Sequence, residues 1–497
     1  MATLLEHTMS DRFNLLDFSK ANIRTLHLTW LAFFVSFMVW FAHAPLMPFI
    51  RDALQLTDLQ TNMLLILNVA MTIPARILVG MLVDRYGPRI LFSAILILGG
   101  TISMGFALAE SFQQLAMMRF LSGFVGAGFV VGIRMISEWF PARQTGVAQG
   151  IYGGWGNFGS AGAAGLLPTV AVAVGGPDGW RYAVALTGLI SIAYGILFYW
   201  RARNTPKGST YFKPKKTGAL EVTSGFDLVL YMVMNIPMYL ALGVLTWKLS
   251  PSGMKLLGDG AAYAIYAVLA LTYLVQIWKI WHVNAHILKE KVPELQRYAF
   301  TQVAILDLAY MVTFGTELAV VSMLALFYVD MFAMDKVSAG LLAGSYAMIN
   351  LVARPAGGML SDKFGRKVTL IIAFIGIALS FMMLSNVSQE WSLPMVVMAA
   401  TFGGIFSKAG SGAVYAMVPL IQRRLTGQIA GMTGAYGNVG GVSFLTVLAL
   451  VSTQTFFLVI GTTAAVVLIF IAFFLREPKG HMTEVLPDGT VQLIEVN

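Results

Sequence analysis

Long apolar runs, separated by short polar or charged segments, fill most of the chain. Runs of about 20 apolar residues are typical of helices that cross a bilayer, where the backbone must satisfy its own hydrogen bonds. The runs lie near residues 27–50, 60–83, 90–109, 113–137, 146–174, 182–200, 227–248, 261–283, 299–329, 338–360, 368–386, 393–420, 427–450 and 454–475. The pattern predicts an all-α polytopic membrane protein with about fourteen spans.

The order of the runs predicts two six-helix halves joined by a longer central part. Six runs precede a basic linker at 201–225, two follow it, and six more come after a charged stretch at 286–297. By length, the two central runs are additional spans; interfacial or re-entrant helices are the alternative. We divide the chain into an N-terminal tail, an N-terminal half, a central linker, a C-terminal half and a C-terminal tail: 1–26, 27–200, 201–297, 298–475 and 476–497.

Two motifs occur twice. The glycine signature is TGVAQGIYGGWGNFG at 145–159 and TGQIAGMTGAYGNVG at 426–440, an offset of 281 residues (426 minus 145). The loop motif is RILVGMLVDRYGPR at 76–89 and RPAGGMLSDKFGRK at 354–367, an offset of 278 (354 minus 76). Two independent motifs at nearly one offset indicate that the chain is a duplicated unit.

Composition and charge narrow the class of protein. The chain is 57% hydrophobic and 11% charged, whereas soluble domains carry about 25% charged residues. We attribute the net charge of +9 to basic residues in alternate loops, which places those loops and both termini in the cytoplasm and argues against a nucleic-acid partner. There is no cysteine, and we find no metal cluster, phosphate loop or nucleophile motif. We therefore expect no metal, no cofactor and no enzyme activity.

The tails carry little further signal. The first 25 or so residues are polar and lack the short apolar core of a cleaved signal peptide. In the C-terminal tail, apolar and polar residues alternate on both sides of Pro487, Asp488 and Gly489. This alternation around a turn predicts a small β-hairpin.

The repeated motifs resemble those of known transporters. The loop motif is similar to that of the major facilitator superfamily, where it follows the second helix of each half. The glycine signature resembles the nitrate signature of the nitrate/nitrite porter family, in its fifth and eleventh helices, and the central stretches are closest to the plant and cyanobacterial branch. Arg76 and Arg354, eight residues before the loop-motif aspartates, match that family's paired substrate arginines. The resemblance implies a major facilitator fold with halves related by a pseudo-two-fold axis and a substrate site between them.

Physical reasoning gives the two arginines the same role. Eight helical residues span about 12 Å, which places Arg76 and Arg354 in the middle third of a hydrocarbon core roughly 30 Å thick. An intramembrane arginine faces a cavity or a partner, and the spans hold few carboxylates, chiefly Glu317 and Asp307. Two planar guanidinium groups suit a planar oxyanion such as nitrate or nitrite. Structural pairing with carboxylates is the alternative.

The glycine signature has two interpretations. Small residues at intervals of three or four let helices pack closely in a membrane. The same glycines also leave space beside an anion, to which asparagine amides can donate hydrogen bonds. On the second interpretation, the substrate-binding residues besides the arginines are Gly153, Gly156, Asn157, Gly434, Gly437 and Asn438.

The remaining candidates concern conformation and coupling. By resemblance, the loop motifs hold the halves together in one state and release them on switching; the residues concerned are Gly80, Asp84, Arg85, Gly87, Gly358, Asp362, Lys363 and Gly365. Glu317 is the leading candidate to carry a coupled proton and His43 the second, with helix packing as the alternative for both. Phe41, Tyr310 and Phe314 are candidate walls of the cavity or plain packing residues.

These inferences converge on transport. We expect a transporter in the cell membrane that imports nitrate, and nitrite as well, by proton symport. Electroneutral nitrate/nitrite exchange is the alternative, and a transporter-like nitrate sensor is less favoured because the tails are short. Phosphate or an organophosphate is disfavoured because we identify no further cation at comparable depth in the spans.

Overall fold

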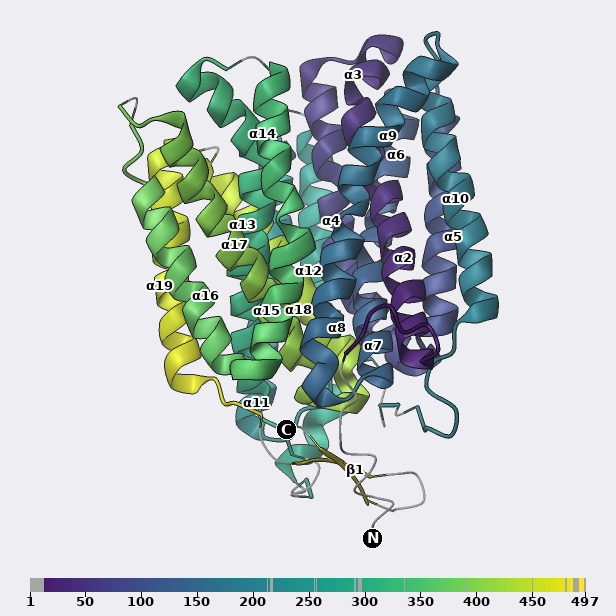
Figure 1. The fold of residues 1–497 in the computed structure, drawn as a ribbon, viewed down its shortest axis with the longest axis vertical. Coiled ribbons are helices and arrows are strands. Elements are labelled where there is room, and N and C mark those ends of the chain that lie inside the picture. Colours follow the sequence, from purple (N-terminus) through teal and green to yellow (C-terminus); the bar gives the residue numbers. More distant parts are fainter. Residues whose placement is uncertain are drawn as a thin grey trace.

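The computed structural model is a bundle of long helices with a small two-stranded sheet at one end (Figure 1). The residues that the structure describes are 13–211, 213–214, 218–253, 255, 257–289, 292–293, 297–334, 336–388, 390–448, 450–478, 481–485 and 491–495. Eleven helices within these residues are long and apolar enough to cross a membrane.

The N-terminal half is built from α2 to α10, on one side of the bundle in Figure 1. Its helices are α2 (Ala21–Phe41), α3 (His43–Leu54), α4 (Asp58–Tyr86), α5 (Pro88–Ala107), α6 (Phe112–Leu121), the 3₁₀ segment η2 (Ser122–Ala127), α7 (Gly128–Trp139), α8 (Ala142–Asn157), α9 (Gly159–Val174) and α10 (Gly179–Arg201). The apolar run at 146–174 is thus divided into α8 and α9 at Phe158, directly after the glycine signature's asparagine.

The C-terminal half lies beside it (Figure 1). Its helices are α13 (Phe300–Phe332), α14 (Lys336–Met348), α15 (Asn350–Phe364), α16 (Arg366–Leu384), α17 (Leu393–Met417), the 3₁₀ segments η5 (Val418–Leu420) and η6 (Arg423–Leu425), α18 (Thr426–Leu448) and α19 (Thr453–Phe474). Strand β1 (His481–Val485) then pairs antiparallel with β2 (Val491–Glu495). This is the hairpin expected from the sequence; its turn residues lie outside the described residues. We call this end of the bundle the hairpin end.

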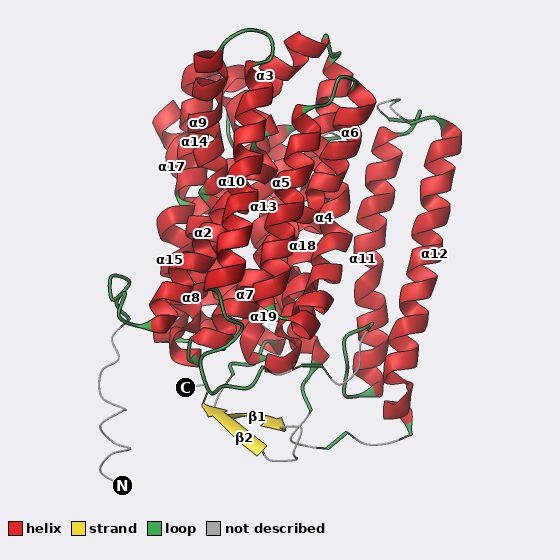
Figure 2. Cartoon of the chain, turned by 90° about the vertical axis from the view of Figure 1, so that its right-hand side faces the viewer, coloured by secondary structure: helices red, strands yellow, loops and turns green. Residues whose placement is uncertain are grey.

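Two helices lie between the halves in sequence and beside them in space. They are α11 (Gly225–Leu249) and α12 (Asp259–Asn284), followed by the 3₁₀ segment η3 (Ala285–Leu288). Figure 2 shows both helices along one edge of the bundle, with α12 outermost. Helix α11 contacts the bundle through the signature aromatic Tyr436, whose hydroxyl donates a 2.6 Å hydrogen bond to the Met234 carbonyl. Both helices are long and apolar enough to cross a membrane.

Two glycines form the turn that follows the second long helix of each half. The loop-motif glycines Gly87 and Gly365 have φ values of 87° and 99°, a left-handed conformation that residues with a Cβ rarely adopt. They turn the chain sharply between α4 and α5 and between α15 and α16.

Other glycines let the two halves approach closely. Across the interface, a Cβ on Gly80 would collide with the Gly427 backbone, and one on Gly358 with the Gly146 backbone. Helices α4 and α18, and α8 and α15, therefore touch backbone to backbone at the hairpin end.

Candidate functional site

Arg76 and Arg354 meet inside the bundle. Arg76 comes from α4 in the N-terminal half and Arg354 from α15 in the C-terminal half, and each is 1% exposed. Their guanidinium carbons lie near the same two rings: 5.7 and 5.3 Å from the Phe129 centroid, and 5.4 and 6.0 Å from the Phe314 centroid. Two guanidinium groups from opposite halves thus share one buried aromatic environment.

Neither arginine has a carboxylate partner within ion-pair distance among the described residues. Arg76 donates from Nη1 to the Gly434 carbonyl at 2.5 Å and from Nε to the Gly126 carbonyl at 3.4 Å. Arg354 donates from Nη2 to the Tyr310 hydroxyl at 2.8 Å, while its Nη1 is buried without a hydrogen-bond partner. Because two neighbouring buried cations repel each other, this geometry favours an anion between them. Among the described residues, the structure therefore does not show the alternative in which both arginines are paired with carboxylates.

Two signature glycines lie directly against the arginines of the opposite half. A Cβ on Gly153 of α8 would stand 2.8 Å from Arg354 Nε, and one on Gly434 of α18 would stand 3.1 Å from Arg76 Cδ. The other two predicted glycines contact rings instead: Gly156 faces Phe33, and Gly437 would bring a Cβ within 2.7 Å of Tyr310. Substitution at the first pair would displace the guanidinium groups directly.

The two signature asparagines are buried with free polar atoms. Asn438 donates from Nδ2 to the Gly434 carbonyl at 3.4 Å, so it shares this acceptor with Arg76, and its Oδ1 has no hydrogen-bond partner. Asn157 is the last residue of α8, and its Nδ2 has no partner either. The structure thus brings Asn438 to Arg76, and it gives Asn157 a buried amide free to donate.

Aromatic side chains close the site. Tyr415 stands edge-on to both Phe129 and Tyr310, with centroids 4.7 and 4.8 Å apart and interplanar angles of 88° and 90°. Tyr310 stacks on Phe314 at 5.1 Å and 4°. Of the three aromatics expected to line the cavity, Tyr310 and Phe314 border the arginines, whereas Phe41 packs on Phe37 and Trp40. This enclosure removes water, which strengthens every charge interaction inside it.

A charged group that the sequence analysis misses lies in the C-terminal half. Lys408 on α17 is fully buried, and its Nζ lies 3.6 Å from the Tyr346 ring centroid. It interacts electrostatically with Glu317 and Arg354. The statement that the spans hold no further cation at depth is therefore wrong. The signal was present as a single lysine within the otherwise apolar and small residues of GGIFSKAGSGAV.

Glu317 is held on α13 close to this lysine. Its Oε1 accepts a 2.5 Å hydrogen bond from Asn350 Nδ2, and its Oε2 is buried without a partner. His43, the second coupling candidate, is placed elsewhere. It lies at the start of α3 and lines a small cavity with Arg119 and Ser122, in which neither Arg76 nor Arg354 takes part.

Each loop-motif aspartate accepts hydrogen bonds from the N-terminal turns of a helix of the opposite half, and we call these contacts the crossed caps. Asp84 accepts hydrogen bonds from the backbone N–H groups of Gly427 and Gln428, at 2.9 and 2.8 Å, at the start of α18. Asp362 accepts from Gly146 and Val147, at 3.0 and 2.8 Å, near the start of α8. Carboxylates at helix N-termini are stabilised by free N–H groups and by the helix dipole. These crossed caps join the halves at the hairpin end.

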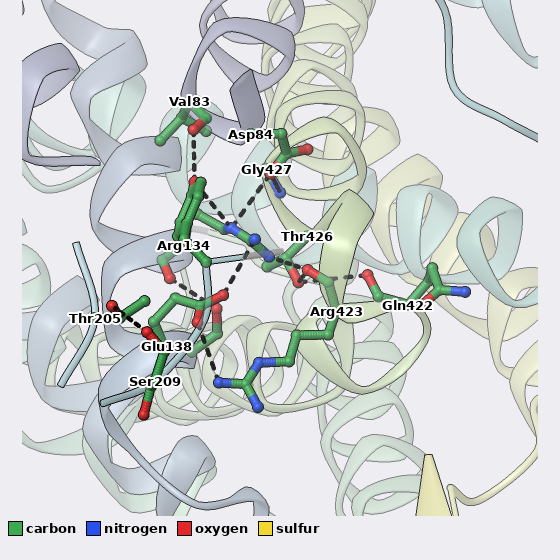
Figure 3. A network of polar contacts seen from close by, with 12 residues as sticks. Val83, Asp84, Arg134, Glu138, Thr205, Ser209, Gln422, Arg423, Thr426 and Gly427 are labelled. Atoms are coloured by element: carbon green, nitrogen blue, oxygen red, sulfur yellow. Dashed lines mark hydrogen bonds and ion pairs between the residues drawn. The ribbon is translucent and has the colours of Figure 1, made fainter. Parts of the chain in front are cut away.

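Arg134 is the ion-pair partner of Asp84 (Figure 3). It lies 3.4 Å from Asp84 and 3.1 Å from Glu138, and Glu138 also binds Arg423 of the other half at 3.1 Å. The Tyr211 hydroxyl donates to the Val83 carbonyl at 2.6 Å. Burial raises the pKa of the Tyr211 phenol above its ordinary range, so it remains a neutral donor. Every member of this network is therefore held by at least one charged or backbone partner.

The basic residues of the loop motif itself do not take part in these caps. Arg85 and Lys363 are exposed and lie over the neighbouring Tyr86 and Phe364 rings, at 5.4 and 5.2 Å. Asp362 is instead 3.5 Å from Arg366. Arg85 and Lys363 were expected to act with the loop-motif aspartates, but the basic partners in the structure are Arg134 and Arg366. Adjacent residues on a helix point in different directions, so the residue next to each aspartate does not reach it.

Comparison with known proteins identifies the family of the chain. The model of the Major Facilitator Superfamily matches residues 29–281 and 306–494. The nitrate/nitrite transporter NrtP of Nostoc punctiforme is 45% identical over 464 residues, covering 92% of this chain and 93% of that protein. The chain belongs to the nitrate/nitrite porter family of the major facilitator superfamily. This confirms the family inferred from the doubled motifs.

Two further relatives show the breadth of the family and its fold. A probable nitrate/nitrite antiporter, NarK1 of Thermus thermophilus, is 26% identical to this porter, covering 84% of this chain and 83% of that protein. The solved structure of the proton:xylose symporter XylE matches with a TM-score of 0.62 at 15% identity, covering 92% of this chain and 97% of that one. At this identity the likeness concerns the fold alone, and it confirms the predicted fold class.

Proposed function

We propose that this porter carries nitrate, and nitrite as well, across the cell membrane by alternating access around Arg76 and Arg354. The observation that carries the proposal is the pair of buried guanidinium groups, one from each half, that share the Phe129 and Phe314 rings. No carboxylate of the described residues lies within ion-pair distance of either group. The similarity to the Nostoc punctiforme nitrate/nitrite transporter supports the same substrate.

The donor set suits a small planar anion. Arg354 offers a free Nη1, and we expect the buried Asn157 amide, four residues after Gly153 on α8, to offer another donor. A flat oxyanion can accept parallel hydrogen bonds from guanidinium forks and lie between aromatic faces. A cation would be repelled by the arginines, and a neutral solute would leave both charges uncompensated.

The crossed aspartate caps supply a means of switching. In this structure Asp84 and Asp362 hold α18 and α8 of the opposite halves. Opening the hairpin end requires these hydrogen bonds to break, and the halves then rock around the arginine site. By the positive-inside rule, the hairpin end faces the cytoplasm, so this structure is closed toward the interior of the cell.

Uptake against a negative interior needs a second ion. Moving one anion inward costs about 2.3 kcal/mol per 100 mV, and arginines do not release protons. We infer proton symport, with Glu317 as part of the proton site. Glu317 is 7% exposed, has a carboxylate oxygen without a hydrogen-bond partner in the described residues, and interacts electrostatically with Arg354. Nitrate/nitrite exchange is the second candidate, favoured by the similarity to the Thermus thermophilus protein.

Purified protein in sealed liposomes distinguishes these functions. Labelled nitrate is followed into liposomes under an imposed inward proton gradient, and in separate liposomes preloaded with nitrite. Accumulation that a protonophore abolishes supports symport; entry only with trapped nitrite supports exchange; no nitrate movement in either case refutes the proposal.

The Glu317→Gln variant tests the coupling residue. We expect it to lose proton-driven accumulation while it keeps nitrate counterflow, because the arginine site is intact. Glu110→Gln, the same change at an exposed position, is the matched control and should behave like the wild type. Accumulation that survives in Glu317→Gln would remove Glu317 from the proton site.

A further inference from the structure

Part of the C-terminal half contains an unusual number of buried polar atoms without hydrogen-bond partners. On α13 they are at positions 313, 316 and 317, on α15 at 350 and 354, and on α17 at 408 and 411. The pairs 313 and 316, 313 and 317, 350 and 354, and 408 and 411 are three or four residues apart, so the members of each pair lie on the same side of their helix. Buried polar atoms normally bind protein, ordered water or an ion. Four of these residues are linked: Glu317 accepts from Asn350, and Lys408 interacts electrostatically with Glu317 and Arg354. We call these four residues, with Arg76 beside Arg354, the compartment.

Lys408 is the charged member of this compartment that has no assigned role. Its Nζ rests on the Tyr346 ring at 3.6 Å and makes no hydrogen bond to any residue that the structure describes. The charged and titratable groups facing it in the described residues are Glu317 from α13, Tyr346 from α14 and Arg354 from α15. Helix α16 carries ionisable groups only in its first turn, Arg366 and Lys367, and α8 contributes Tyr152, whose hydroxyl is bound to the Phe129 carbonyl at 3.0 Å.

The net charge of the compartment suggests what Lys408 does. If the mobile proton is left out of the count, Lys408 as an amine and Glu317 as a carboxylate stand against two arginines, which gives the empty site a net charge of about +1. Adding nitrate together with one proton on Lys408 leaves the net charge at about +1. Since a change in net charge is costly in a medium of low dielectric constant, the two ions enter together more easily than either alone.

We propose that Lys408 carries the coupled proton as the partner of Glu317. A proton from the outer solution binds the free amine of Lys408 when nitrate binds, and both are released on the inner side, so that the amine is regenerated. Glu317 interacts electrostatically with Lys408 and stabilises the ammonium while it exists. This inference rests on nitrate symport as proposed above and assigns the proton within it.

The Lys408→Arg variant separates this mechanism from one in which Glu317 alone carries the proton. Arginine keeps the positive charge and does not release a proton. In liposomes we expect Lys408→Arg to retain nitrate counterflow and to lose proton-driven accumulation. Accumulation at the wild-type level in Lys408→Arg would overturn the proposal and leave nitrate symport standing. Lys279→Arg, on the exposed surface of α12, is the matched control.

If Lys408→Arg does not fold, the proposal can be tested instead by measuring proton uptake when nitrate binds. In weakly buffered detergent solution with a pH-indicator dye, nitrate binding should take up about one proton per nitrate in the wild type and in Lys279→Arg. In Lys408→Met nitrate should bind with no proton uptake. Proton uptake that persists in Lys408→Met would overturn the assignment. A wild-type protein that neither binds nor exchanges nitrate would instead refute the proposed function, and with it this inference.

Discussion

We call Arg76 and Arg354 together the anion clamp. Replacing Arg354 by lysine keeps its positive charge and removes the planar geometry of its hydrogen-bond donors, so it tests how much nitrate binding depends on that geometry. Arg354 uses Nη2 for the Tyr310 hydroxyl at 2.8 Å and leaves Nη1 free. A lysine keeps the positive charge near the rings but has a single nitrogen, which cannot serve both Tyr310 and the substrate in a planar fork. The expected loss is one charge-assisted hydrogen bond to nitrate, about 1.5–3 kcal/mol, or roughly 10- to 150-fold in affinity.

The assay is nitrate affinity, measured by the nitrate-dependent rise in thermal stability and by half-saturation of counterflow in liposomes. Arg119→Lys is the matched control. Arg119 is also buried, and it donates to the Leu64 and Trp40 carbonyls at 2.9 and 3.0 Å, outside the clamp. We expect Arg119→Lys to lower stability without changing affinity. Unchanged affinity in Arg354→Lys, or an equal loss in Arg119→Lys, would refute the clamp.

Two further predictions test the glycine signature and the crossed caps. Gly434→Ala places a Cβ 3.1 Å from Arg76 Cδ, so the guanidinium must shift. Overpacking of about 1–3 kcal/mol should weaken nitrate binding roughly 5- to 150-fold in the same thermal titration. Asp84→Asn leaves Arg134 without one of its buried partners, which should favour the state open at the hairpin end. Because the chain has no cysteine, a single cysteine at Gln428 should then react faster with a maleimide.

Controls for these two variants come from the same helix and the same residue type. Gly441→Ala on α18 meets Leu318 Cδ1 at 2.9 Å, so it should lower stability without lowering affinity; an equal loss of affinity would mean that Gly434 acts through helix packing. Asp52→Asn changes an exposed aspartate, 74% exposed as a side chain, and should leave labelling at position 428 unchanged. Equal labelling in Asp84→Asn and the wild type would show that the cap does not hold the closed state.

The sequence alone was sufficient for the features that depend on local spacing. Apolar runs of span length predict helices because a bilayer accepts few other structures. The repeat offsets identify the duplication, and the eight-residue interval from each arginine to its loop aspartate fixes both depths within a helix. The alternation near the C-terminus predicts the hairpin of β1 and β2. All of these depend on residues that are neighbours in the chain.

Contacts between the halves could not be obtained in this way. Asp84 caps the helix that begins at Thr426, and Arg354 lies against Gly153 of the other half. These partners are separated by hundreds of residues, and they meet only because backbones pack at glycines across the interface. Lys408 was visible as a lysine in an apolar helix, but its neighbours were not.

The sequence by itself thus indicated the apolar helices, the duplication, the family and the depth of the two arginines within their helices. The tertiary structure alone decided that these arginines share Phe129 and Phe314, that Arg134 rather than Arg85 serves Asp84, and that Lys408 stands beside Glu317. The physical reason is that helical periodicity sets which side chains share a face, whereas the packing of distant helices sets what that face meets.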